Sequence, residues 1–82
     1  MQDYKTPLRQ FIEDNFVMGN GKSFGDADSL LKRHIIDSTG VVELVMFLEE
    51  TWAVTVEDAD IVPANLDSLD HLQAFLARKL GA

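Results

Sequence analysis

The sequence predicts an all-α protein: a small four-helix bundle with a long loop between the first and second helices and a short third helix. Apolar residues recur at intervals of three and four along three segments, which is typical of helices with one buried face. The chain has an apolar content of 46% and only two prolines, as expected of a folded protein. Its 82 residues suffice for one core. Residues 1–82 are therefore predicted to form a single domain.

The first helix is predicted from an apolar stripe near the start of the chain. The stripe consists of Leu8, Phe11, Ile12 and Phe16. Thr6 before Pro7 is one candidate start, with Thr6 as N-cap and the proline at the first helical position. Asp3 is an earlier alternative start. The run Gly19-Asn20-Gly21 predicts the end of this helix.

A long connection is expected from about Asn20 to Asp37. Its turn formers are Gly25, Asp26 and Asp28. The apolar residues expected to attach it to the core are Leu30, Leu31, Ile35 and Ile36. A connection of this length between helices is uncommon and tends to be functional.

The second helix is predicted from about Ser38 to Trp52, with two distinct faces. The core stripe consists of Val41, Leu44, Val45, Leu48 and Trp52. The opposite face consists of Thr39, Val42, Glu43, Met46, Glu49 and Glu50. This second face mixes acids with apolar residues, which is typical of a surface that meets another protein.

Two further helices are predicted in the last third of the chain. Thr55 is the expected N-cap of a short helix from Val56 to Val62, which Pro63 ends. The acids in its first turn are Glu57 and Asp58.

Asp67 is the expected N-cap of the last helix, with Asp70 as its capping-box acid. Its predicted buried residues are Leu69, Leu72, Phe75, Leu76 and Leu80. Gly81 is expected to end this helix.

Composition excludes several classes of function. The chain has no cysteine, which rules out disulfides, thiolate metal sites and a cysteine nucleophile. The net charge is −7, and no Lys or Arg occurs between His34 and Ala77, a stretch that carries nine acids. Such a field repels nucleic acids and anionic membranes and attracts basic protein surfaces.

The sequence also bears on location. No secretory signal is recognisable at the start, and the longest apolar run, Leu44 to Leu48, is far too short to span a bilayer. We therefore expect a cytoplasmic monomer without membrane insertion.

Three Asp-Ser dipeptides offer candidate functional serines, namely Ser29, Ser38 and Ser68. Ser29 precedes only a short apolar patch, and Ser68 fits the first turn of the last helix as a capping residue. Only Ser38 has the long loop before it and the acidic, two-faced helix after it. A helix N-terminus offers free N–H donors to an anion, which suits a phosphodiester on this serine.

The run I-I-D-S-T-G-V-V-E-L-V-M-F-L-E-E, residues 35–50, resembles acyl carrier proteins. The likeness is strongest from Val42 to Glu50 and extends more weakly to helix order and length over most of the chain. It resembles the discrete, specialised carriers more than the general carrier of fatty-acid synthesis.

The resemblance implies a function in fatty-acid or secondary-metabolite biosynthesis. Ser38 would carry a 4'-phosphopantetheine arm taken from coenzyme A, and Asp37 would be read by the phosphopantetheinyl transferase. Acyl or aminoacyl groups would then be held as thioesters. They would be loaded by an AMP-forming acyl or aminoacyl ligase and passed to downstream acyl-using enzymes.

The resemblance also implies the surface that meets these partners. Its acidic positions are Glu43, Glu49 and Glu50, and its apolar positions are Val42 and Met46. Thr39, directly after the modified serine, belongs to the same surface.

Three residues depart from the family pattern. Thr39 replaces the usual leucine after the serine. Gly40 lies in the first turn, where it costs about 1 kcal/mol relative to alanine, and the sequence offers no reason for it. His34 stands where similar carriers often have glycine, and it is expected to face solvent.

The same residues could serve other functions. Catalysis by Ser38 with His34, or by Ser68 with His71, lacks a third group and an oxyanion site, so no enzyme and no catalytic residue is predicted. The acidic segments Asp26–Asp37 and Asp58–Leu69 both lack the ligand spacing of a calcium-binding loop. No metal site is therefore predicted. The open alternative is a non-covalent acidic adaptor that binds a basic protein.

Overall fold

A computed structural model describes residues 3–17 and 24–81, and this part of the chain contains four α-helices and no strand. The helices are α1 (Lys5–Ile12), α2 (Ser38–Trp52), α3 (Pro63–Leu66) and α4 (Leu69–Leu80). A π-helical segment, Glu13–Val17, continues α1, and a 3₁₀ turn, Asp58–Asp60, precedes α3. The predicted all-α class is therefore confirmed.

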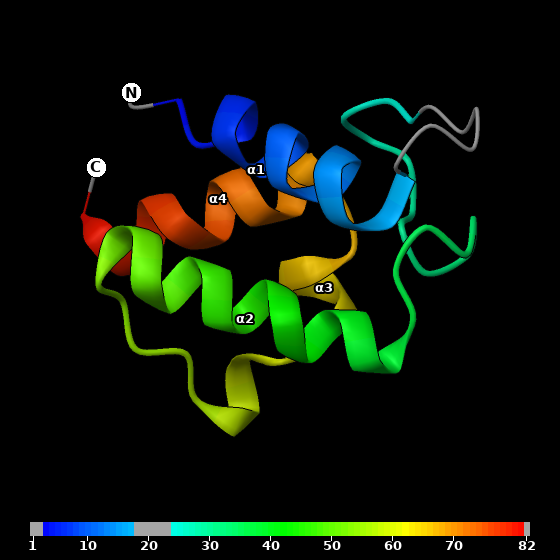
Figure 1. Cartoon of the computed structure of the whole chain (residues 1–82). Helices are drawn as coiled ribbons and strands as arrows, with labels where there is room; N and C mark the ends of the chain where they lie inside the picture. Colours follow the sequence, from blue (N-terminus) through cyan, green and yellow to red (C-terminus); the bar gives the residue numbers. More distant parts are fainter. Residues whose placement is uncertain (1–2, 18–23, 82) are drawn as a thin grey trace.

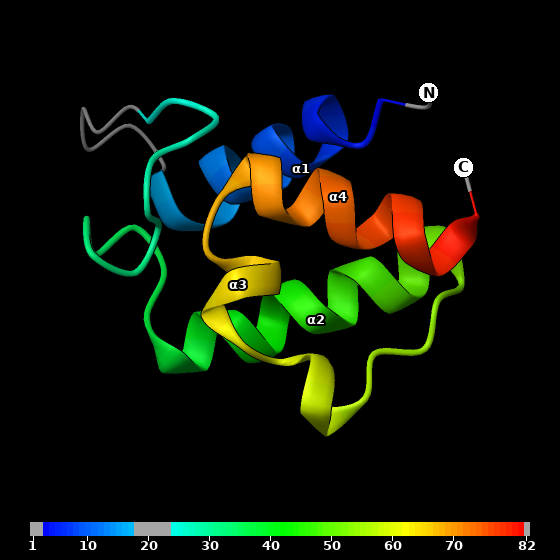
Figure 2. The same cartoon turned by 180° about the vertical axis from the view of Figure 1, so that it is seen from behind.

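The three longer helices pack side by side, with α1 running opposite to α2 and α4 (Figures 1 and 2). The first residue of α2, Ser38, therefore lies at the end of the molecule where α1 finishes. The short α3 contacts α4 and leads directly into it (Figure 2). No helix in the described ranges is both long and apolar enough to cross a membrane.

One apolar core joins the helices and the long loop. Its most deeply buried members are Tyr4, Leu8, Ile12, Leu30, Ile36, Leu44, Leu48, Leu69, Leu72, Phe75 and Leu76. Ile35 is also buried and Leu31 is half-buried, so the predicted attachment of the loop to the core is confirmed.

The first helix begins at Lys5 with Tyr4 as its N-cap, close to Asp3, the earlier of the two predicted starts. The Asp3 carboxylate accepts the backbone N–H groups of Lys5 and Thr6 at 2.9 and 3.3 Å. The Thr6 hydroxyl donates to the same carboxylate at 2.5 Å, so Thr6 is inside the helix and does not cap it. The predicted end at Gly19-Asn20-Gly21 falls outside the described residues.

The second helix has the predicted bounds. Within its core stripe Leu44 and Leu48 are fully buried, while Val41, Val45 and Trp52 are partly buried. The Trp52 ring makes edge contacts with Tyr4 at 5.5 Å and with Phe47, so its predicted core role is confirmed.

The prediction of a helix from Val56 to Val62 is wrong. Only Asp58–Asp60 is helical there, as a 3₁₀ turn that Glu57, not Thr55, caps in a reciprocal box with Asp60. Pro63 begins α3 instead of ending a helix. Proline forces the preceding residue out of the α region and itself fits the first helical position, and this combination starts a new helix.

The N-cap of α4 is Ser68, not Asp67 as predicted, and its side chain accepts the His71 N–H. Asp70 does not form a capping box; it pairs with Lys5 at 2.5 Å. Leu80, predicted to be buried, is exposed in the last turn. Gly81 ends the helix with φ at +71°, which confirms that prediction.

Candidate functional site

The serine hydroxyls of the three Asp-Ser dipeptides differ in exposure and in hydrogen bonding. Ser38 is the first residue of α2 and is exposed. Its hydroxyl makes no hydrogen bond within residues 3–17 and 24–81. A serine in this setting is open to chemical modification.

Ser29 is used to hold the loop. Its hydroxyl donates to Asp67 Oδ2 at 2.5 Å, and the Leu31 N–H donates to Asp67 Oδ1 at 2.9 Å. The Leu30 N–H donates to the Asp67 backbone carbonyl at 2.7 Å. The first and third dipeptides thus bind one another, across 38 residues of sequence.

Ser68 is used to start α4 and is only 1% exposed. Its Oγ accepts the His71 N–H at 3.1 Å and lies 2.9 Å from His71 Nδ1. Of the three serines, Ser38 alone presents a free, accessible hydroxyl.

The start of α2 retains backbone donors beside Ser38. Asp37 is the N-cap: its carboxylate accepts the Gly40 N–H at 2.7 Å, and its carbonyl accepts the Val41 N–H at 3.0 Å. The N–H groups of Ser38 and Thr39 have no acceptor among the described residues. They and the positive end of the helix dipole favour an anion at this position.

An apolar groove of about 330 Å³ opens next to Ser38. It lies between the first half of α2, the long loop and α3. Its lining residues are Leu30, Leu31, Ile36, Ser38, Val41, Val42, Ile61, Val62, Pro63 and Leu66. The sequence did not indicate this groove. Residues 56–62 were predicted to be helical, whereas Ile61 and Val62 lie outside any helix, next to Pro63, and line the groove.

Gly40 has a packing reason that the sequence did not show. A Cβ at this position would lie 2.8 Å from Phe16 Cε1 and 2.9 Å from Ile36 Cγ2. Phe16, at the end of the π-helical segment, therefore packs directly on the α2 backbone two residues after Ser38. The glycine permits this approach and fixes the start of α2 against α1.

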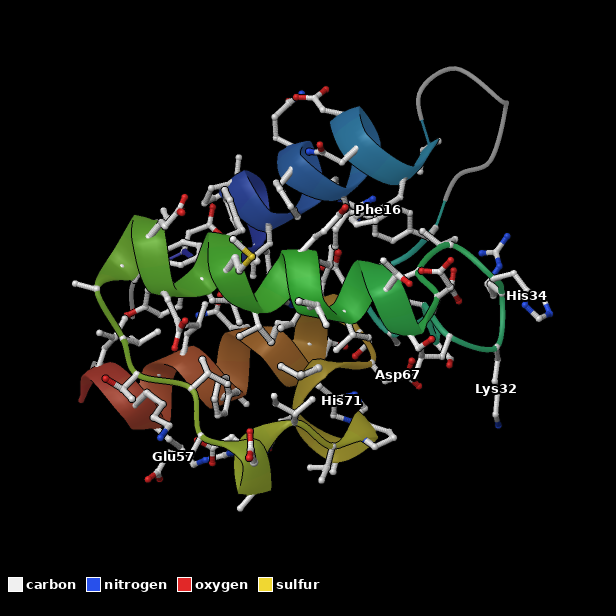
Figure 3. All side chains as sticks on the ribbon, turned by 60° about the horizontal axis from the view of Figure 1, so that its bottom comes forward. Phe16, Lys32, His34, Glu57, Asp67 and His71 are labelled. Atoms are coloured by element: carbon white, nitrogen blue, oxygen red, sulfur yellow. The ribbon has the colours of Figure 1, made fainter. Side chains whose placement is uncertain are left out.

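His34 adopts the left-handed backbone conformation, with φ at +56°. Glycine reaches this conformation without strain, whereas a side chain with a Cβ is strained there. The imidazole is exposed, as expected, and with Lys32 it points away from the helices (Figure 3).

The acidic face of α2 is largely open. Val42 and Met46 are 59% and 54% exposed. Glu43 and Glu50 are also exposed, and their carboxylates have no hydrogen bond or ion pair within the described part of the chain. Glu49 differs because it is half-buried and accepts the Val56 N–H at 3.0 Å, which holds the segment after α2.

Ion pairs hold the other side of the loop. Asp26 binds Arg9 at 2.7 Å and Lys5 at 3.3 Å, and Lys5 also binds Asp70. The Arg9 hydrogen bond, with that of Lys5, lowers the pKa of Asp26. Contact with Asp70 and Asp26 raises the pKa of Lys5. The loop is thus fixed by charge on the α1 side and by Asp67 on the α4 side.

Comparison with protein-family models and with curated proteins gives no match to this chain.

Proposed function

We propose that the protein is a carrier that holds acyl or aminoacyl groups as thioesters on a 4'-phosphopantetheine arm attached to Ser38. The observation that carries this proposal is the contrast among the three Asp-Ser serines. Ser29 and Ser68 have their hydroxyls hydrogen-bonded, whereas Ser38 is free at the start of a long helix.

The chemistry of attachment fits these residues. The Ser38 hydroxyl oxygen would form a bond to the phosphorus that bears pantetheine, and the diphosphate bond of coenzyme A would break. Adenosine 3',5'-bisphosphate would leave, and a base of the transferase would take the hydroxyl proton. The open N–H groups of Ser38 and Thr39 would stabilise the resulting phosphodiester. The arm would supply the thiol that this cysteine-free chain lacks.

The groove beside Ser38 supports the same proposal. Its lining is almost wholly apolar, and it begins at the residue that would bear the arm. Apolar parts of the arm or its cargo would gain free energy by leaving water for this groove.

The partners we propose are a phosphopantetheinyl transferase, an AMP-forming acyl or aminoacyl ligase and downstream acyl-using enzymes. Asp37 and Thr39 flank the modified serine, where the transferase must approach. The exposed Val42 and Met46, with the acids Glu43 and Glu50, fit basic partner surfaces with apolar centres. In this arrangement Glu49 would act mainly through its bond to the Val56 N–H.

The test is the mass of the intact protein after incubation with coenzyme A, magnesium and a broad-specificity phosphopantetheinyl transferase. Wild type is compared with Ser38→Ala, Ser29→Ala and Ser68→Ala. We expect wild type and the last two variants to gain one phosphopantetheine, and Ser38→Ala to gain none. Circular dichroism checks that each variant is folded.

Other outcomes would decide against the proposal. Modification that persists in Ser38→Ala and disappears in another folded variant would move the site. If no folded protein is modified, even by the transferase of the native host, the non-covalent acidic adaptor becomes the better account. Ser38→Ala would then leave partner binding unchanged.

A further inference from the structure

A second groove, with a volume of about 360 Å³, lies between the π-helical segment after α1, the residues before Ser38 and the first turns of α2. Its lining residues are Asn15, Phe16, His34, Ile35, Asp37, Thr39, Gly40 and Glu43. None of these residues lines the apolar groove beside Ser38, so the two grooves are separate. This polar groove is within the size range of small-molecule sites.

The polar groups of this groove are mainly hydrogen-bond acceptors. The Asn15 amide nitrogen donates to the Phe11 carbonyl at 2.8 Å, which leaves Asn15 Oδ1 available. One carboxylate oxygen of Asp37 accepts the Gly40 N–H, and the other has no bond within the described residues. The Glu43 carboxylate is likewise without a partner there. The polar groove therefore fits a ligand that carries N–H or O–H donors.

All three residues that depart from the pattern of similar carriers, His34, Thr39 and Gly40, line the polar groove. Thr39 supplies a hydroxyl where leucine would supply apolar surface alone. Gly40 lets the Phe16 ring approach the α2 backbone and form an apolar part of the lining. His34 adopts a left-handed conformation that is unfavourable for a residue with a Cβ. The groove is thus formed in part by residues that this chain has in place of the family pattern.

We propose that the polar groove binds the phosphopantetheine arm of Ser38 when the arm carries no cargo. This binding rests on the proposed function, because it needs an arm on the serine. After its phosphate the arm has two methyl groups, a hydroxyl and two amides. The amide N–H groups and the hydroxyl would donate to Asn15 Oδ1 and to the Glu43 carboxylate. The methyl groups would pack on Phe16, and the Thr39 hydroxyl would donate to an amide carbonyl.

The polar groove is placed for the first part of the arm. Asp37 and Thr39 flank Ser38 in the sequence, and both line the groove, so an arm attached to the serine enters it directly. The phosphate would bind the open N–H groups of Ser38 and Thr39, which offset the nearby carboxylates.

The apolar groove is a poor site for the unloaded arm. The residues that line it, apart from Ser38, all have apolar side chains. Amides moved from water into this groove would lose hydrogen bonds, which is unfavourable. A long aliphatic cargo reverses the balance, because its methylene groups gain free energy by burial there. We therefore expect the arm in the polar groove before loading and in the apolar groove afterwards.

The test follows the contacts of the arm by nuclear magnetic resonance in the isotope-labelled full-length protein. One sample carries phosphopantetheine on Ser38, and a second carries the same arm with an octanoyl group in a stable amide linkage. Intact mass checks that both are completely modified. In the first sample we expect nuclear Overhauser contacts from the arm methyl groups to the Phe16 ring, and a shift of the Asn15 amide. In the second we expect contacts to Val62 and Leu66 instead.

A pair of threonine variants isolates the hydroxyl in the polar groove. Thr39→Val keeps the shape of the side chain and should reduce the ratio of bound to free arm about two- to ten-fold, as expected for one hydrogen bond. The ratio is read from the size of the Asn15 shift. Thr51→Val makes the same change at an exposed position of α2 outside both grooves and should have no effect. Circular dichroism checks that both variants are folded.

The failure of arm binding and the failure of the carrier function give different results. An arm on Ser38 that makes no contact with Phe16, whether it is free in solvent or lies in the apolar groove, would overturn binding in the polar groove and leave the proposed function intact. Equal effects of Thr39→Val and Thr51→Val would do the same. If intact mass shows that no folded protein is modified, the proposed function fails, and arm binding fails with it.

Discussion

The starts of α2 and α4 have nearly the same sequence signal and opposite accessibility. In α2 the aspartate of the dipeptide, Asp37, is the N-cap, so Ser38 is the first helical residue and its hydroxyl is free. In α4 the serine, Ser68, is the N-cap, so its hydroxyl is consumed and buried. A shift of one residue in the cap position thus determines whether the serine is available for chemistry.

The two aspartates differ in the same way. Asp37 satisfies the helix that follows it, whereas Asp67 reaches back to Ser29 and Leu31 in the long loop. A local contact needs only the neighbouring backbone, but the Asp67 contacts need the folded loop. The start of α4 is therefore hydrogen-bonded to the long loop, whereas the start of α2 is exposed to solvent.

The largest expected effect comes from removing the Asp67 hydrogen bonds to the long loop. Asp67→Ala should lower the free energy of unfolding by about 2–3 kcal/mol, because two hydrogen bonds to a half-buried carboxylate are lost. Asp37→Ala should cost only about 1 kcal/mol, as expected for one N-cap. Urea unfolding of both variants measures the difference. Equal losses of stability would contradict the distinction between the loop contacts of Asp67 and the local helix cap of Asp37.

Gly40 provides the next test. It lies three residues after Asp37, as Asp70 lies three residues after Asp67. Gly40→Val should destabilise the protein by about 2 kcal/mol, because the added atoms overlap Phe16 and Ile36. Because glycine is a poor helix former, replacing it with valine would stabilise α2 slightly if no atoms lay close to the added side chain. Thermal unfolding measures the effect. Partial recovery in the double variant with Phe16→Ala would identify the ring as the obstacle.

The paired serine substitutions test the comparison directly. Ser68→Ala should cost about 1 kcal/mol through loss of the N-cap. Ser38→Ala should leave stability unchanged within about 0.5 kcal/mol, because its hydroxyl has no partner in the described structure. Both values come from urea unfolding. A large cost at Ser38 would mean that its side chain is structural.

His34 sharpens the description of the loop that leads into Ser38. His34→Gly should stabilise the protein by up to about 1 kcal/mol, because glycine adopts a φ of +56° without strain. If Ser38 is modified as proposed, its modification should proceed at the wild-type rate, since the imidazole points to solvent (Figure 3). Unfolding and transferase kinetics report the two properties separately. Slower modification would assign the histidine a role in recognition.

The smallest effect concerns pH. Arg9 and Lys5 lower the pKa of Asp26 in the folded state, so this contribution to stability is present above the unfolded pKa of about 4 and is lost as pH falls through the lower, folded value. Asp26→Asn should therefore flatten the loss of stability in acid. The urea midpoint, measured from neutral pH to about pH 3, tests the slope. An unchanged slope would show that the ion pairs around Asp26 contribute little.

The sequence predicted much of the fold because local signals carry it. Apolar periodicity gave α2 its bounds and gave α4 its buried residues apart from Leu80. The segment around Pro63 was predicted wrongly, because a proline preceded by apolar residues is compatible with the end of one helix or the start of another. The groove beside Ser38 was missed for the same reason.

By itself the sequence determined the helical class, the acidic middle of the chain and the absence of cysteine. These properties depend on composition and on contacts within one or two turns. Only the tertiary structure decided which Asp-Ser hydroxyls are occupied, why Gly40 is required and where the two grooves lie. The Ser29–Asp67 bond and the Phe16–Gly40 contact join residues distant in sequence, and no local pattern encodes such pairs.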